Sequence, residues 1–121
     1  MSARANRVLI VEDEPMLAMD LESMLESLSF EIAGSAGRIE TATRLASGAA
    51  CDVAILDLNL GGTSAEAVAD ILSARGIPFI FATGYGDGYV DERFASVRVV
   101  EKPYDRQTIE GALSHMLGSA R

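Results

Sequence analysis

The sequence has few basic residues, a single cysteine and no long run of apolar residues, and each shortage excludes a class of function. Ten lysines and arginines stand against eighteen aspartates and glutamates, which leaves a net charge of −8. Nucleic acid is therefore not expected as a direct partner, because phosphate backbones are bound by clustered Lys and Arg. The lone Cys51 excludes an internal disulfide and a metal site built from several cysteines.

No segment of the sequence predicts contact with a membrane. No apolar run approaches the roughly 20 residues that a transmembrane helix needs, and residues 1–6 are too short and polar for a signal peptide. We therefore expect a cytoplasmic protein with no membrane partner. A length of 121 residues suits one domain over residues 1–121. The sequence stops just after its last expected helix, so we expect no output domain.

Apolar runs alternate with segments of helical periodicity along almost the whole chain. The expected strands are 8–11, 30–33, 53–56, 79–82 and 97–100. Their apolar residues are continuous, which is typical of strands buried on both faces of a parallel sheet. The helices between them are expected to begin at Pro15, near Ile39, at a capping box over residues 63–66 and after Asp105. This alternation predicts an α/β fold with right-handed crossovers and a five-stranded parallel sheet.

The stretch of residues 84–96 departs from this pattern. It carries Gly84, Gly86 and Gly88, and each glycine costs a helix about 1 kcal/mol relative to alanine. We expect the helix between the fourth and fifth strands to be short, frayed or absent.

Polar residues follow the expected strands at their carboxyl ends, where chemistry gathers in parallel sheets. The first strand is followed by Glu12 and Asp13, the third by Asp57, the fourth by Thr83 and the fifth by Lys102-Pro103. Three carboxylates at one edge of a sheet repel one another unless a cation lies between them. Mg²⁺ suits such a place, because it takes one or two carboxylates and keeps several waters.

The donor atoms suggest how the ion is held. Asp13 and Asp57 suit direct coordination, and the backbone carbonyl of Asn59 suits a third ligand. Glu12 is expected to act through a water molecule. The protein then fills only part of the coordination shell, which leaves room for phosphate oxygens.

Beside such an ion, Asp57 is placed as a nucleophile towards phosphorus, forming an aspartyl phosphate. Phosphoryl transfer depends mostly on positioning and on charge neutralisation. Lys102 offers a second positive charge for this purpose, and Thr83 offers a hydroxyl donor to a phosphoryl oxygen.

Two other classes of function fit the sequence less well. Phosphatases of the haloacid dehalogenase type also phosphorylate an aspartate at a strand end, but they place an acid two residues later, where this chain has Asn59. A nucleotide- or flavin-binding module needs a loop that cradles phosphate after the first strand. The acidic residues 12–14 stand there and would repel phosphate.

The whole set of motifs resembles the receiver domains of bacterial two-component response regulators, over essentially the entire chain. The residues that carry the resemblance are the acid pair at 12–13, Asp57, Thr83 and Lys102-Pro103, each closing an apolar strand in this order. Residues 81–85 also resemble the branch that is named FATGUY after its motif. The complete set argues against a degenerate receiver that only binds partners.

This resemblance implies a flavodoxin-like (βα)5 doubly wound fold with strand order 2-1-3-4-5 and, often, a cis Lys102–Pro103 bond. It also implies phosphorylation of Asp57 by a sensor histidine kinase and slow loss of the phosphoryl group to water. The chain is then a signalling switch rather than an enzyme. It is expected to act on a downstream protein target or on a phosphotransfer protein, as in a relay or a sink.

The chain departs from the family pattern near the acid cluster. Most receivers carry two aspartates where this chain has Glu12 and Asp13, and the longer arm of glutamate is compatible with contact through water. A proline that is common four residues after the acceptor is replaced by Gly61, with Gly62 next. We therefore expect a looser loop there.

A second departure concerns the switch. The family usually has an aromatic residue three positions before the lysine, and here that position is Val99. Tyr85 is the candidate replacement. The expected switch set is therefore Thr83, Tyr85, Lys102 and Pro103.

Overall fold

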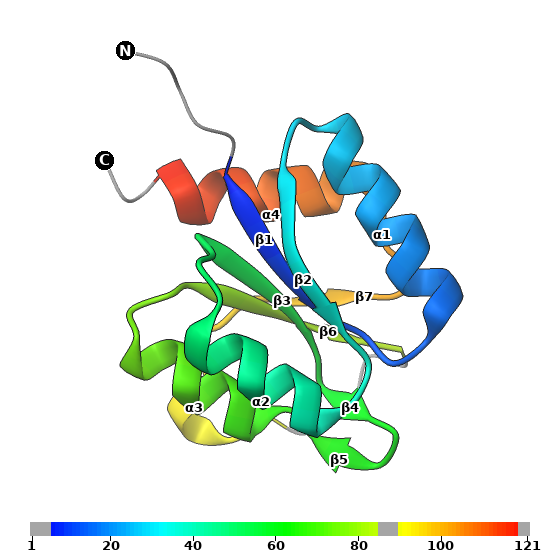
Figure 1. Cartoon of the computed structure of the whole chain (residues 1–121). Coiled ribbons are helices and arrows are strands. Elements are labelled where there is room, and N and C mark those ends of the chain that lie inside the picture. The colour runs from blue at the N-terminus through cyan, green and yellow to red at the C-terminus, as the bar shows by residue number, and fades with distance from the viewer. Residues whose placement is uncertain (1–5, 85–89, 119–121) are drawn as a thin grey trace.

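Five strands form one parallel sheet in the computed structural model, which describes residues 6–84 and 90–118 (Figure 1). In spatial order they are β2 (Glu31–Ala36), β1 (Arg7–Val11), β3 (Val53–Asp57), β6 (Phe79–Thr83) and β7 (Val99–Glu101). All neighbouring pairs are parallel. The fourth and fifth expected strands are β6 and β7, so the predicted flavodoxin-like order 2-1-3-4-5 is confirmed.

Helices cover both faces of the sheet (Figure 1). One face carries α1 (Pro15–Ser27) and α4 (Arg106–Gly118), and the other carries α2 (Ile39–Gly48) and α3 (Glu66–Ala74). The strands alternate between the two layers because successive side chains point to opposite faces. In β1, for example, Leu9 packs in the α2–α3 layer and Ile10 in the α1–α4 layer, and both are fully buried.

Two strands differ in extent from the sequence prediction. β2 was expected at 30–33, but it runs through Gly34 to Ala36. Pairing with β1 continues through Gly34 after a register shift between Val8 and Leu9, the kind of irregularity that a glycine inside a strand marks. A Cβ at Gly34 would lie 3.1 Å from Leu45 Cδ1, so little space is left there for a side chain. β7 was expected at 97–100 and is shorter, at Val99–Glu101.

The loop after β3 was expected to be loose, and this prediction is wrong. Residues 59–64 form a tight hairpin of β4 (Asn59–Leu60) and β5 (Thr63–Ser64). The φ angles of Gly61 and Gly62 are +59° and +93°. A two-residue type I′ turn needs positive φ at both central positions, which glycine adopts without strain.

The expected capping box at the start of α3 is also wrong. Thr63 belongs to β5, and the residue before the helix is Ala65, whose side chain cannot cap it. The hydroxyl of Ser64 instead accepts a hydrogen bond from the backbone N–H of Glu66 at 3.1 Å. At α4 the prediction is confirmed, because Asp105 Oδ2 accepts from the backbone N–H of Thr108 at 2.9 Å.

The stretch before β7 contains only a 3₁₀ turn, η1 (Glu92–Phe94), within its described residues 84 and 90–96. This agrees with the expected weak fourth helix. Phe94 is 4% exposed and anchors the turn to the sheet. Its ring meets those of Phe79 and Phe81 edge-on, with centroids 6.0 and 5.6 Å apart.

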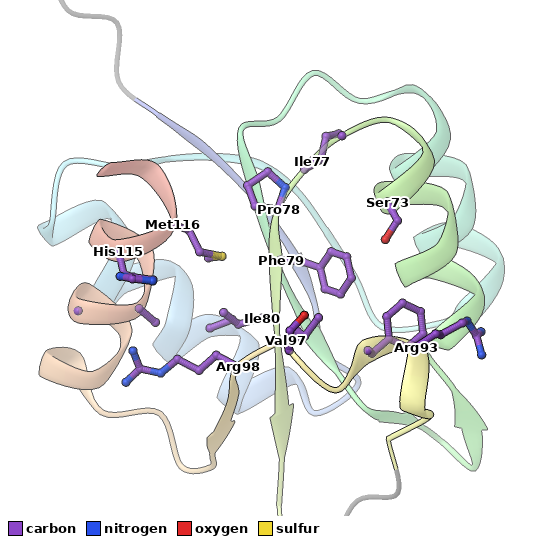
Figure 2. A pocket seen from close by; sticks show the side chains of 15 residues that line it. Ser73, Ile77, Pro78, Phe79, Ile80, Arg93, Val97, Arg98, His115 and Met116 are labelled. Atoms are coloured by element: carbon purple, nitrogen blue, oxygen red, sulfur yellow. The ribbon is translucent and has the colours of Figure 1, made fainter. Parts of the chain in front are cut away.

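Short β7 leaves the start of β6 without a strand partner on that side within the described residues, because β7 pairs only with the last three residues of β6. A groove with a volume of about 1050 Å³ lies there, between α3, η1 and α4 (Figure 2). Phe79 and Ile80 lie in it, with Arg98 and His115 beside them. The groove shares no residue with the acidic edge of the sheet.

In the part of the chain that the structure describes, no helix combines the length and the apolar character that crossing a bilayer requires.

A substitution at Phe94 tests how firmly η1 is packed against the sheet. Phe94→Ala should lower the free energy of unfolding by about 3 kcal/mol, because it removes a buried ring and leaves a cavity against two others. Met16→Ala is the control, since Met16 is 79% exposed and its loss should change stability by less than about 0.5 kcal/mol. Urea unfolding measures both. Equal effects of the two substitutions would show that η1 is not packed on the sheet.

Candidate functional site

Three carboxylates meet at the carboxyl ends of β1 and β3. Glu12 and Asp13 directly follow β1, and Asp57 is the last residue of β3. One oxygen from each of these residues lies within 4.8 Å of the others. Glu12 and Asp57 are 2% and 3% exposed, and Asp13 is half-buried. The structure therefore brings together the three acids that the sequence places at strand ends.

Lys102 brings a positive charge into this cluster from the end of β7. Its Nζ lies 3.0 Å from Asp57 Oδ2 and 3.2 and 3.3 Å from the two carboxylate oxygens of Glu12. Its side chain is 8% exposed, so these ion pairs are screened little by water. The Lys102–Pro103 bond is cis, as the family resemblance implied.

Glu12 has two further donors. The hydroxyl of Tyr104 donates to Oε1 at 2.7 Å, and the backbone N–H of Glu14 donates to Oε2 at 3.0 Å. Sequence reasoning assigned Tyr104 no part in the site. Its position two residues after Lys102 was the only available signal, and that signal does not show where the hydroxyl points.

The hairpin of β4 and β5 donates backbone hydrogen bonds to the other two acids, Asp13 and Asp57. The backbone N–H of Asn59 donates to Asp57 Oδ1 at 3.1 Å, and that of Gly61 donates to Asp13 Oδ2 at 3.0 Å. The side-chain oxygen of Asn59 accepts from the N–H of Gly62 at 2.6 Å. The tight turn therefore fixes the positions of Asp13 and Asp57 relative to each other.

Thr83 ends β6 and is 7% exposed. It lines a cavity of about 420 Å³ together with Asp13, Asp57, Asn59 and Lys102. The backbone carbonyl of Thr83 accepts the N–H of Lys102 at 2.8 Å, which ties the ends of β6 and β7 together.

Of the remaining members of the expected switch, Pro103 is exposed and does not line this cavity. Val99, which stands where the family usually has an aromatic residue, is 41% exposed at the start of β7. Tyr85 lies outside the described residues.

Burial and like charge both act on Asp57. The pKa of its carboxyl is raised to about 7: loss of water contact raises it most, Asp13 and Glu12 also raise it, and the hydrogen bonds from Asn59 and Lys102 oppose the rise. For Lys102, burial alone would lower the pKa, but Asp57 and Glu12 outweigh it and the pKa is raised. The ammonium of Lys102 therefore offsets only part of the negative charge of the three carboxylates.

A hard divalent cation fits this arrangement. All the side-chain donors facing the cavity from Asp13 and Asp57 are carboxylate oxygens, the ligands that Mg²⁺ prefers. The excess negative charge supplies the attraction. The cavity beside them is large enough for a phosphoryl group and several waters.

Known proteins resemble the chain over most of its length. The family model of the response regulator receiver domain matches residues 8–114. The phyllosphere-induced regulator PhyR of Methylorubrum extorquens is 33% identical over 117 residues, which make up 93% of this chain and 44% of PhyR. The chain therefore spans less than half the length of this curated relative.

Solved structures agree with this match over nearly whole chains. The solution structure of SdrG from Sphingomonas melonis is 44% identical, with a TM-score of 0.81, and the match covers 97% of this chain and 99% of SdrG. A BeF3-activated conformation of SdrG from Pseudomonas melonis is 42% identical, with a TM-score of 0.76 and the same coverage of both chains. This chain belongs to the response regulator receiver domain family, the phosphorylated switches of two-component signalling.

Proposed function

We propose that the chain accepts a phosphoryl group on Asp57 from the phosphohistidine of a sensor histidine kinase, with Mg²⁺ bound at Asp13 and Asp57. The observation that carries this proposal is the contact of Lys102 Nζ with Asp57 Oδ2 at 3.0 Å, beside a cavity that Asp13 and Thr83 also line. A nucleophile, two charge-neutralising groups and a hydroxyl donor then surround one space.

Asp57 is the acid best placed to act as the nucleophile. The side chain of Glu12 is fully buried, held by Tyr104 and Lys102, and does not line the cavity. Asp13 also lines the cavity, but Lys102 contacts Asp57, whereas Asp13 is held by the N–H of Gly61. In the proposed step a carboxylate oxygen of Asp57 forms a bond to phosphorus while the P–N bond of the phosphohistidine breaks. The electron pair of that bond remains on the imidazole.

The metal ligands in this proposal are Asp13, Asp57 and the backbone carbonyl of Asn59. Glu12 was expected to act through water, but its side chain is fully buried and does not line the cavity, so it contributes negative charge from behind Lys102 instead. Bound there, Mg²⁺ supplies positive charge to the phosphoryl oxygens. Lys102 supplies the second charge from the other side, and Thr83 offers its hydroxyl to a phosphoryl oxygen from the end of β6.

The switch is proposed to start at Lys102. A phosphoryl group on Asp57 attracts its ammonium more strongly than the carboxylate did, and the backbone N–H of Lys102 is bonded to the carbonyl of Thr83. A shift of either residue therefore moves the ends of β6 and β7 together, with Pro103 next to them. Tyr85 remains part of the proposal on sequence grounds alone.

The output is proposed to be contact with a downstream protein or transfer to a phosphotransfer protein, within the cytoplasm. Two relatives support this: PhyR from Bartonella quintana is an anti-anti-sigma factor, and SdrG has a BeF3-activated conformation. Loss of phosphoryl to water is expected to be slow. Asn59 stands where a phosphatase of the haloacid dehalogenase type needs an acid, and its amide cannot exchange protons in that role.

Labelling with a small phosphodonor tests the acceptor. Wild-type protein incubated with Mg²⁺ and a labelled acyl phosphate should take up label, while Asp57→Asn, or wild type with a chelator, should not. Asp20→Asn is the matched control, because Asp20 is an exposed aspartate on α1. Uptake of equal label by Asp57→Asn would show that the acceptor lies elsewhere.

The electrostatic part of the site is tested in metal-free protein. Asp13→Asn should lower the pKa of Asp57 from its value of about 7, because the neighbouring carboxyl contributes to the raised value. Carbon-13 NMR of the Asp57 carboxyl measures the titration, with Asp20→Asn as the control that should leave it unchanged. An unaltered titration in Asp13→Asn would mean that the two acids do not interact.

A further inference from the structure

Glu12 is the most deeply enclosed acid of the cluster. Its side chain is fully buried, while those of Lys102 and Asp57 are 8% and 4% exposed. A buried carboxylate is strongly destabilising unless donors satisfy it. The contacts of Glu12 therefore decide whether the site is stable before any cation or phosphoryl group arrives.

The charge of Lys102 is not available to Glu12 alone, because the ammonium also contacts Asp57. Its Nζ is closer to Asp57 Oδ2, at 3.0 Å, than to either oxygen of Glu12, at 3.2 and 3.3 Å. A phosphoryl group on Asp57 would draw the ammonium further towards the cavity. Glu12 then needs other donors that stay where they are.

The hydroxyl of Tyr104 is such a donor. Its 2.7 Å contact is the shortest of the contacts to Glu12, and hydrogen bonds to ionised groups are about twice as strong as neutral ones. The Tyr104 ring packs against the core layer that contains Ile109 and Leu113 of α4, so the hydroxyl is fixed in place. Burial, the bond to Glu12 and the nearby carboxylates raise the pKa of Tyr104, which keeps its proton on the oxygen.

We propose that Tyr104 is a positioning residue that fixes the Glu12 carboxylate at the back of the acidic cluster and thereby leaves Lys102 free to serve Asp57. The proposal rests on the function proposed above and deepens it. It also gives a reason for glutamate rather than aspartate at position 12, since the longer arm reaches the hydroxyl. Glu12 and Tyr104 then act as a pair.

A double-mutant cycle tests the pair. The variants are Tyr104→Phe, which keeps the ring, Glu12→Asp, which withdraws the carboxylate by one methylene, and the two combined. Thermal unfolding of the metal-free proteins measures the contact itself. Tyr104→Phe should lower the midpoint by about 5 °C when Glu12 is present. With Asp at position 12 it should have almost no effect, because the hydroxyl has already lost its acceptor.

Magnesium affinity measures the positioning role, by calorimetry or by amide NMR shifts of unphosphorylated protein. Tyr104→Phe should weaken Mg²⁺ binding about tenfold in the presence of Glu12. In the Glu12→Asp protein the same substitution should change it by less than about twofold. A residue that served only to fill space would show equal effects in both backgrounds.

Two results would overturn the proposal. Equal effects of Tyr104→Phe on the midpoint in both backgrounds would show that the contact carries no energy. If Tyr104→Phe lowered the unfolding midpoint only when Glu12 is present but left the Mg²⁺ affinity unchanged, the contact would be structural and would have no positioning role. Neither readout involves phosphorylation, so a failure of Asp57 to take label is distinguished from a failure of this pair.

Discussion

Three carboxylates and one ammonium meet at one edge of the sheet, and the rest of the site is arranged around that excess of negative charge. Lys102 contacts two of the acids, and the third, Asp13, is held by a backbone N–H of the hairpin. Tyr104 and the N–H of Glu14 donate further hydrogen bonds to the oxygens of Glu12, and the N–H of Asn59 donates to the second oxygen of Asp57. These donors keep the acids ordered, but they carry no net charge. The cluster remains attractive to a cation, which is what a receiver site requires.

The parallel sheet brings the carboxylates together and so creates this excess of negative charge. Parallel strands end at the same edge, so β1, β3 and β6 deliver their last residues to one place. Continuous apolar strands hold those ends rigidly, because both faces are covered by helices and every residue of β3 and β6 is buried. A carboxylate is therefore buried at Asp57 by the sheet itself, and its raised pKa follows from that position.

Much of the sheet and of the acidic site could be predicted from the sequence, because each apolar run indicates a buried strand and a charged residue that interrupts the run indicates the end of that strand. The hairpin at 59–64 could not be predicted, since two-residue strands carry no periodicity and Gly61-Gly62 reads equally as a loose loop. The extension of β2 through Gly34 could not be predicted either, since a glycine after a short apolar run is typical of a strand end, whereas here the pairing with β1 shifts register and continues. The role of Tyr104 depends on where a hydroxyl points, which follows from packing and not from spacing.

The position of Val99 limits how a change at Asp57 can travel. In this chain a small, 41% exposed side chain stands where the receiver family usually has an aromatic residue, so rotation of a ring at that place is not available to the proposed switch. Two connections remain within the described residues. The N–H of Lys102 is bonded to the carbonyl of Thr83, and its Nζ contacts Asp57 Oδ2 at 3.0 Å. In the proposed switch, Lys102 both responds to the charge of a phosphoryl group on Asp57 and is bonded through its backbone N–H to the end of β6. In the proposed switch, the joined ends of β6 and β7 are therefore the first backbone to respond to a change at Asp57.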